Sequence, residues 1–161
     1  MGKLKHTLRW GIALFLGLVG VLSILTPPKQ SAHAGDPLLA GARIDPQVLS
    51  IIQRSCRDCH SEATQYPWYS YVAPVSWLVE SDVDGGRRHL NLSHWSEYPL
   101  ARRERSLSEI ANQVKDRDMP LPQYTWIHRD ARLSAADVDA VFQWTQTERA
   151  RLIAESSGSQ R

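Results

Sequence analysis

The sequence predicts a mostly α-helical domain behind an N-terminal apolar helix. Within the 161-residue chain, apolar residues recur at helical spacing in several segments. No segment alternates polar and apolar residues convincingly, as a half-buried strand does. The N-terminus joins basic residues to an uncharged apolar run, a combination typical of a signal or anchor segment. The length suits a single domain, and loops rich in aromatic residues separate the expected helices.

The distribution of charge excludes one class of partner. The formal net charge is +2, but residues 1–34 carry four basic residues and no acidic one. Subtracting those four from the 19 basic residues leaves 15 against 17 acidic residues, a net charge of −2. Nucleic-acid binding needs a basic face, and this composition does not supply one. We therefore expect no nucleic-acid partner.

Residues 1–25 resemble a signal peptide or a signal anchor. The uncharged run Trp10–Leu25 has 16 residues and as a helix spans about 24 Å. A helix that crosses a bilayer usually needs ~20 residues, so this run is short for a membrane span. Residues 32–34, Ala-His-Ala, match a cleavage site, whereas Arg9 beside the run suits an uncleaved anchor. In either case the basic end stays in the cytoplasm. We expect the domain on the periplasmic side of the cytoplasmic membrane, held by this anchor, or free in the periplasm after cleavage.

Composition divides the rest of the chain into a linker, a domain and a tail. Residues 26–43 are rich in proline, glycine and polar residues, as linkers are. Asp45 and Pro46 have the pattern of an N-cap followed by proline at the first helical position. We therefore expect the folded domain at residues 44–152. Residues 153–161 are expected to form a flexible tail.

Four helices are expected inside the domain. The first carries Val48, Ile51 and Ile52 on one face. Gly85-Gly86 is expected to end the second, and the third has capping-box spacing between its first residue and Glu109. The segment between the first two is too rich in proline and aromatic residues for a regular helix. The helices are expected to start at Asp45, Pro74, Ser106 and Ser134.

The stretch RSCRDCHSE contains both cysteines of the chain, Cys56 and Cys59, with His60 directly behind. A disulfide between cysteines this close would close a very small ring. A dithiol of the thioredoxin type expects a βαβ setting, which is absent. A zinc site needs four ligands, and no second pair has suitable local spacing.

The pattern Cys-x-x-Cys-His is instead the attachment signature of c-type haem. Thiols one helical turn apart can each add across a vinyl group of the porphyrin, and the histidine can bind the iron. Attachment outside the cytoplasm agrees with the expected export. We predict one covalent haem c attached through Cys56 and Cys59 with His60 as proximal iron ligand, and zinc or a redox dithiol remains as the alternative. The predicted fold is thus a small, cytochrome c-like helical domain.

Met119 is the candidate for the sixth iron ligand. It is the one methionine besides the initiator, and Pro120 behind it disfavours helix and holds the segment extended. A thioether in such a segment can occupy the position opposite the histidine. His128 is the fallback ligand. Arg87 and Arg88 are expected on a solvated face.

These residues carry a resemblance to a bacterial haem-binding domain family with a Cys-x-x-Cys-His motif. The similarity extends over roughly residues 45–150 and rests on three segments: CRDCHSEATQYPWYSYVAPVSWLVESDVDGGRRHLNLSHW, MPLPQYTWIHRDARLS and FQWT. It implies a small mono-haem protein, often behind an N-terminal membrane segment, which favours a retained anchor over a cleaved signal.

Electron transfer is the function that this site predicts. An iron bound by both His60 and Met119 leaves no open position for a substrate, so a one-electron carrier with unidentified redox protein partners is expected. The main alternative is a haem-based sensor or gas-binding module with an open or displaceable sixth ligand. Peroxidase catalysis is the third possibility, and His128 with Arg129 is the adjacent pair that resembles its distal groups.

Overall fold

The computed structural model describes residues 2–25, 27–28 and 37–158, and it confirms the mostly α fold. These described residues form seven α-helices and three 3-10 helices, without a strand. The proposed cleavage site at residues 32–34 lies outside them. The elements are α1 (Gly2–Leu25), α2 (Pro46–Ser55), α3 (Arg57–His60), η1 (Trp68–Tyr71), α4 (Val75–His89), η2 (Leu92–Glu97), α5 (Leu100–Lys115), α6 (Pro122–Ile127), η3 (Arg129–Ala131) and α7 (Ala135–Gly158).

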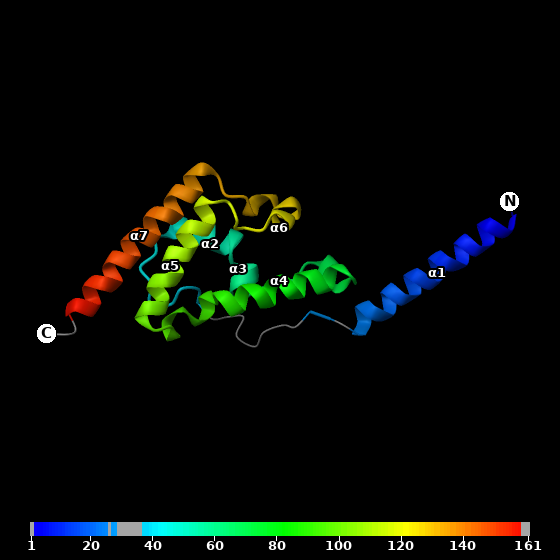
Figure 1. Cartoon of the computed structure of the whole chain (residues 1–161), viewed down its shortest axis with the longest axis horizontal. Coiled ribbons are helices and arrows are strands. Elements are labelled where there is room, and N and C mark those ends of the chain that lie inside the picture. Colours follow the sequence, from blue (N-terminus) through cyan, green and yellow to red (C-terminus); the bar gives the residue numbers. More distant parts are fainter. Residues whose placement is uncertain (1, 26, 29–36, 159–161) are drawn as a thin grey trace.

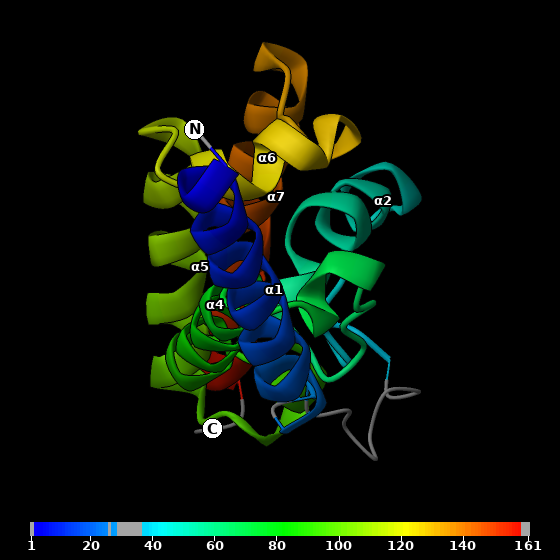
Figure 2. The same ribbon diagram turned by 90° about the vertical axis from the view of Figure 1, so that its right-hand side faces the viewer.

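α1 runs away from the other helices and is long and apolar enough to cross a membrane (Figures 1 and 2). Its 21 residues Lys5–Leu25 have a mean hydropathy of 2.1, and none of the apolar stretch is buried against the protein. The full helix of 24 residues is about 36 Å long. It is longer than the uncharged run alone because it begins well before Trp10. A signal peptide or a membrane anchor contains such a helix.

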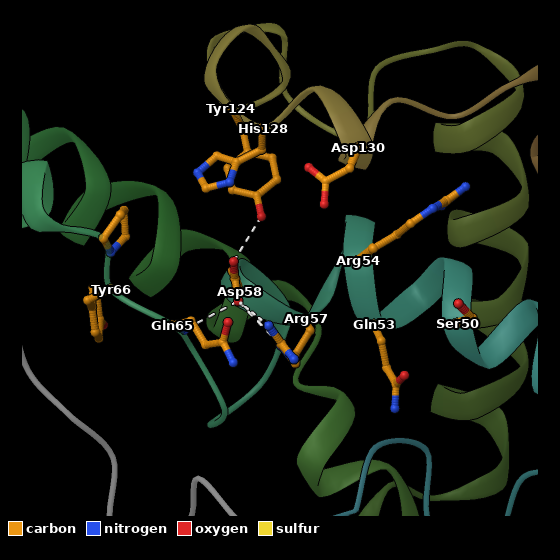
Figure 3. A pocket seen from close by; sticks show the side chains of 11 residues that line it. Ser50, Gln53, Arg54, Arg57, Asp58, Gln65, Tyr66, Tyr124, His128 and Asp130 are labelled. Carbon is orange, nitrogen blue, oxygen red and sulfur yellow. Dashed lines mark hydrogen bonds and ion pairs between the residues drawn. The ribbon is translucent and has the colours of Figure 1, made fainter.

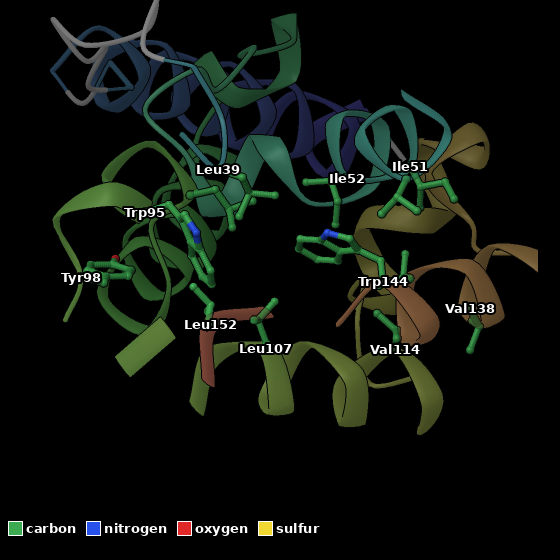
Figure 4. Close-up of a cluster of buried hydrophobic side chains, with 13 residues drawn as sticks. Leu39, Ile51, Ile52, Trp95, Tyr98, Leu107, Val114, Val138, Trp144 and Leu152 are labelled. Carbon is green, nitrogen blue, oxygen red and sulfur yellow. The ribbon is translucent and has the colours of Figure 1, made fainter. Parts of the chain in front are cut away.

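The hydrophobic core lies between α2, α5 and α7 (Figure 4). α5 and α7 pack along each other, and α2 packs against α7. The three apolar residues predicted on one face of α2, Val48, Ile51 and Ile52, are all buried. Trp144 of α7 is also buried, and its indole N–H donates to the Arg43 carbonyl at 2.9 Å. This core holds α2 in place, and the Cys-x-x-Cys-His segment follows α2 directly.

Part of the expected linker belongs to this core. Leu39 is only 2% exposed, and its backbone N–H donates to the Leu92 carbonyl at 2.9 Å. Nearby, the backbone N–H of Arg43 donates to buried Glu148 at 3.3 Å, and Glu148 also pairs with Arg151 of α7. The described residues before α2 are irregular, so they have no periodicity from which their burial could be predicted. The packed domain therefore begins before residue 44.

α4 continues through Gly85-Gly86 to His89, so the predicted end at these glycines is wrong. Glycine in a helix interior costs about 1 kcal/mol relative to alanine, which is the basis of that prediction. The helix continues because α3 packs against it at this place. The start near Pro74 is confirmed, since α4 begins at Val75.

α5 begins at Leu100, and the predicted start at Ser106 is wrong. Ser106 is buried inside the helix, so its spacing with Glu109 does not mark a capping box. The residues from 100 to 105 are good helix formers. The guanidinium of Arg102 also lies 3.8 Å from the centre of the Tyr98 ring, which supports this first turn.

α7 begins as predicted, next to Ser134. Ser134 Oγ accepts a hydrogen bond from the Asp137 N–H at 3.1 Å, and Asp137 Oδ2 accepts one from the Ser134 N–H at 2.8 Å. This reciprocal pair is a capping box formed with aspartate. The expected flexible tail is helical as far as Gly158, where Arg151 bonds both Glu155 oxygens at 2.8 and 2.7 Å. The last three residues of that tail lie outside the described residues.

Candidate functional site: the Cys-x-x-Cys-His segment

The Cys-x-x-Cys-His segment forms a helical turn directly behind α2. The Cys56 N–H donates to the Ile52 carbonyl at 2.9 Å and ends α2. The His60 N–H then donates to the Cys56 carbonyl at 3.0 Å across α3. Residues three and four apart in a helical turn are neighbours, so this turn brings Cys59 and His60 next to Cys56. The segment thus has the local form that the spacing predicts.

Both cysteines are unpaired, and their surroundings favour the neutral thiol. Burial raises the pKa of Cys56 to about 12. Burial, with the nearby Asp82 carboxylate, raises the pKa of Cys59 to about 11. Zinc binding and thiol–disulfide exchange both use the thiolate, which is scarce here at neutral pH. Among the described residues, moreover, no three His, Cys, Asp or Glu side chains gather as metal ligands. Both thiols are therefore protonated in this environment.

The His60 ring is oriented by the end of α4. Its Nδ1 lies 3.0 Å from the Leu90 carbonyl oxygen. A carbonyl can only accept, so Nδ1 carries the proton and donates, and Nε2 keeps a free lone pair. Burial lowers the pKa of His60, so the ring is neutral at physiological pH. A neutral imidazole fixed through one nitrogen is the usual arrangement of a metal-binding histidine.

Gly86 allows α4 to approach this segment closely. A Cβ atom at Gly86 would lie 2.4 Å from the Cys59 carbonyl oxygen, a distance that real Cβ contacts do not reach. The obstructing atom belongs to the backbone and cannot rotate away. The helix interior therefore contains glycine here because the turn with Cys59 and His60 lies directly against it.

Replacing Gly86 by alanine is expected to separate α3 from α4. We expect Gly86→Ala to lower the unfolding free energy of the haem-loaded protein by about 1–3 kcal/mol, the usual cost of overpacking. Gly85→Ala is the matched control: at Gly85 the nearest atom to a new Cβ is the Arg88 side chain, at 3.9 Å. That variant is expected to gain about 1 kcal/mol from helix propensity. Urea unfolding measures both, and equal stabilities would contradict the close approach.

Arg87 fixes the chain that leaves His60. Its guanidinium donates to the Ser61 carbonyl at 2.8 Å and to Thr64 Oγ1 at 2.9 Å, and it lies 3.5 Å from the Glu62 carboxylate. The side chain is only 18% exposed. The expected solvated face is therefore wrong for Arg87 and right for Arg88, which is exposed. The reason is that the segment 61–64 folds back onto α4.

α6 covers the other side of the segment through Tyr124. Its hydroxyl donates to Asp58 Oδ2 at 2.8 Å (Figure 3). Burial and Asp58 raise the pKa of Tyr124, which keeps this hydroxyl protonated. The His128 ring stacks on Tyr124 with centroids 4.3 Å apart, and its Nε2 shares a hydrogen bond with the Tyr69 hydroxyl. The fallback iron ligand is thus engaged by two tyrosines.

A cavity of about 550 Å³ opens beside this tyrosine–histidine group (Figure 3). Neither cysteine of the motif, nor His60, nor Met119 lines it. Among the predicted haem ligands only the fallback ligand, His128, lines it. Its lining residues are Ser50, Gln53, Arg54, Arg57, Asp58, Gln65, Tyr66, Pro67, Tyr124, His128 and Asp130.

Met119 lies in the loop between α5 and α6 and is half-buried. Its backbone N–H donates to the Gln113 carbonyl at 3.2 Å, which ties the loop to the end of α5. The loop leads directly into α6, whose Tyr124 bonds Asp58 inside the cysteine motif. The segment that carries Met119 is thereby connected to the segment that carries His60, although they are far apart in sequence.

Four groups that hold the Cys-x-x-Cys-His segment in place are not predicted from the sequence: Gly86, Arg87, the Leu90 carbonyl and Tyr124. A backbone carbonyl leaves no trace in a sequence. The pair Gly85-Gly86 predicts the end of a helix, not a close approach between two helices. The donor set nevertheless fits a covalent haem, because it offers two neutral, unpaired thiols beside an imidazole whose Nε2 is unprotonated.

The comparison with known proteins agrees with this site. A family model described as a haem-binding domain matches residues 16–147. "Cytochrome c peroxidase Ccp" of Escherichia coli (strain K12) is 22% identical over 151 residues, which cover 91% of this chain but 32% of that protein. The chain therefore spans about a third of the length of this curated relative. No solved structure matches the chain. Because the family model covers most of its residues, the chain belongs to the haem-binding domain family.

Proposed function

We propose that this protein is a mono-haem c-type cytochrome that transfers single electrons on the outer face of the cytoplasmic membrane. The observation that carries the proposal is the state of His60. Its Nδ1 donates to the Leu90 carbonyl, so Nε2 is the unprotonated nitrogen of a neutral imidazole that follows directly behind two unpaired cysteines. Such an imidazole is suited to bind the iron of a haem, which supports this role in a chain of the haem-binding domain family.

Each residue of the site has a separate role in this proposal. Cys56 and Cys59 would hold the haem through thioether bonds, and His60 and Met119 would supply the two iron ligands. When bound, the haem supplies reversible one-electron oxidation and reduction at iron. Thioether ligation favours the ferrous state relative to a second histidine and so raises the reduction potential. Leu90 and Gly86 hold the proximal side rigid, so that little rearrangement accompanies the change of charge.

The location follows from α1. The helix is long enough to be a retained anchor, and the basic residues before its apolar run favour a cytoplasmic N-terminus. Everything after the anchor then faces the periplasm, where thioether attachment of haem takes place in bacteria. Redox partners of this domain are therefore proteins of the periplasm or of the same membrane.

Purification of the full chain from separate membrane and soluble fractions tests the proposal. We expect a pyridine haemochrome spectrum of the c type, one haem per chain, in the membrane fraction. The ferrous protein is expected not to bind carbon monoxide at neutral pH. Ready binding of carbon monoxide would favour the alternative function, a haem-based sensor or gas-binding module with an open sixth position.

Peroxidase activity is a second candidate because the curated relative is named as a cytochrome c peroxidase. It would require a distal base and a positive charge, for which His128 and Arg129 are the adjacent pair. His128 is stacked on Tyr124 and bonded to Tyr69, and Arg129 is exposed. Turnover of hydrogen peroxide with a reduced electron donor, lost in His128→Ala, would establish this activity; we expect no such turnover.

A further inference from the structure

The segment that joins the cysteine motif to α4 exposes an unusual amount of apolar and aromatic surface. No charged residue occurs between Glu62 and Glu80. Within this stretch Trp68 is 78% exposed, and Tyr71, Val72 and Val75 are 39%, 38% and 39% exposed. These four residues, on η1, the short segment after it and the first turn of α4, are called the aromatic edge below. Exposed large apolar side chains gathered in one short segment mark an interaction surface.

The aromatic edge lies beside the last turn of α1. Ser23 Oγ, two residues before the end of α1, accepts a hydrogen bond from the Ala73 backbone N–H at 3.0 Å. Ala73 is itself buried and stands in the middle of the aromatic edge. Figures 1 and 2 both show the end of α1 next to the start of α4. If α1 crosses the bilayer, its last turn lies at the depth of the lipid headgroups, and Ala73 lies at the same depth.

We propose that the aromatic edge inserts into the lipid interface of the membrane that α1 crosses. Tryptophan and tyrosine favour this zone because each joins an apolar ring to a polar group. The lack of charge between Glu62 and Glu80 removes the cost of moving ionised groups toward lipid. A lipid membrane fits this surface better than a protein partner does, because the hydrogen bond from Ala73 to Ser23 joins the surface to the membrane helix α1. The inference rests on the proposed retention of α1 as an anchor.

Two attachments restrict how the domain can lie. A single membrane helix would attach the domain at one place only, which does not by itself fix its orientation. A second contact, through η1 and α4, holds the domain with the aromatic edge toward the lipid. α4 ends at His89, and the carbonyl of the next residue, Leu90, orients His60, so the same helix joins the membrane contact to the proximal side of the site. Partners then approach from the sides that face the periplasm.

Photo-crosslinking of the full haem-loaded chain in nanodiscs of phosphatidylethanolamine and phosphatidylglycerol tests the inference. p-Benzoylphenylalanine is placed at Trp68, at Phe15 in α1, or at Ile153 in α7, and adducts are identified by mass. Ile153 is the matched control, an exposed apolar side chain (48%) near the end of α7, and Figure 1 shows that α7 ends on the opposite side of the domain from α1. All three side chains are largely exposed, and an unchanged haem spectrum verifies that each variant has folded.

We expect lipid adducts at Trp68 and Phe15, with at least a tenfold lower yield at Ile153. Adducts at Phe15 with none at Trp68 would overturn the inference and leave the anchor intact. Adducts at Trp68 to a second chain, or equal lipid yields at Trp68 and Ile153, would overturn it as well. A lack of lipid adducts at Phe15 would contradict the anchor itself, and with it the inference.

Discussion

Replacing Cys56 and Cys59 together by alanine is expected to abolish covalent haem. Without thiols no thioether can form, so acidified acetone should extract all haem from the double variant and none from the parent protein. The measurement is haem-stained gel electrophoresis of the full chain with a pyridine haemochrome spectrum. The single variants are the matched controls, since each keeps one thiol and therefore one possible thioether bond. Haem that survives extraction in the double variant would contradict the attachment.

The double variant is also expected to lose only part of its helicity. The core between α2, α5 and α7 contains neither Cys59 nor His60, so those helices keep their apolar contacts without haem. α3 and the loop that carries Met119 lose the group that they are proposed to bind. We expect reduced far-ultraviolet circular dichroism with a broad melting transition. A transition as sharp as that of the parent protein would show that the fold does not depend on haem.

Replacing Met119 by alanine is expected to open the sixth position of the iron. The ferric parent should show the weak sulfur-to-iron band at the red end of the visible spectrum, and Met119→Ala should lose it completely. The ferrous variant should bind one carbon monoxide per haem, where the parent binds none. Its reduction potential should fall, because the thioether no longer stabilises the ferrous state.

His128→Ala distinguishes the two candidate ligands. If Met119 binds the iron, His128→Ala keeps the sulfur-to-iron band and does not bind carbon monoxide. It does so although the contacts of His128 with Tyr69 and Tyr124 are lost. If Met119→Ala leaves the spectrum unchanged while His128→Ala opens the iron to carbon monoxide, His128 is the distal ligand. A parent protein that binds carbon monoxide without either substitution would point to the sensor function.

Helix caps and apolar helix faces, which depend on a few neighbouring residues, could be predicted from the sequence. The N-cap Asp45, whose carboxylate accepts the Val48 N–H at 3.0 Å, and the capping pair of Ser134 with Asp137 act across a single helical turn. The apolar face of α2 follows from helical periodicity in the same way. The predicted start of α5 was wrong because a capping-box spacing also occurs by chance inside a helix, here at Ser106.

Contacts between distant segments could not be predicted in this way. Leu39 is buried although its segment is irregular, since it packs against residues around Trp95. Gly86 has the composition of a helix breaker, yet the helix needs a glycine there because the Cys59 backbone lies against it. Tyr124 and Asp58 are 66 residues apart and meet only in the folded protein.

The sequence by itself determined the donor groups of this protein: two thiols and an imidazole at the spacing of a haem attachment motif, behind an N-terminal apolar segment typical of a signal or an anchor. These properties depend on residue types a few positions apart, where chain geometry leaves little freedom. Tertiary structure alone decided how the chemistry is supported. In the folded protein the Leu90 carbonyl orients the His60 ring, and α4 contacts α3 at Gly86. The aromatic edge lies beside the end of α1. Those relations arise from packing of segments far apart in the chain, which a local pattern does not encode.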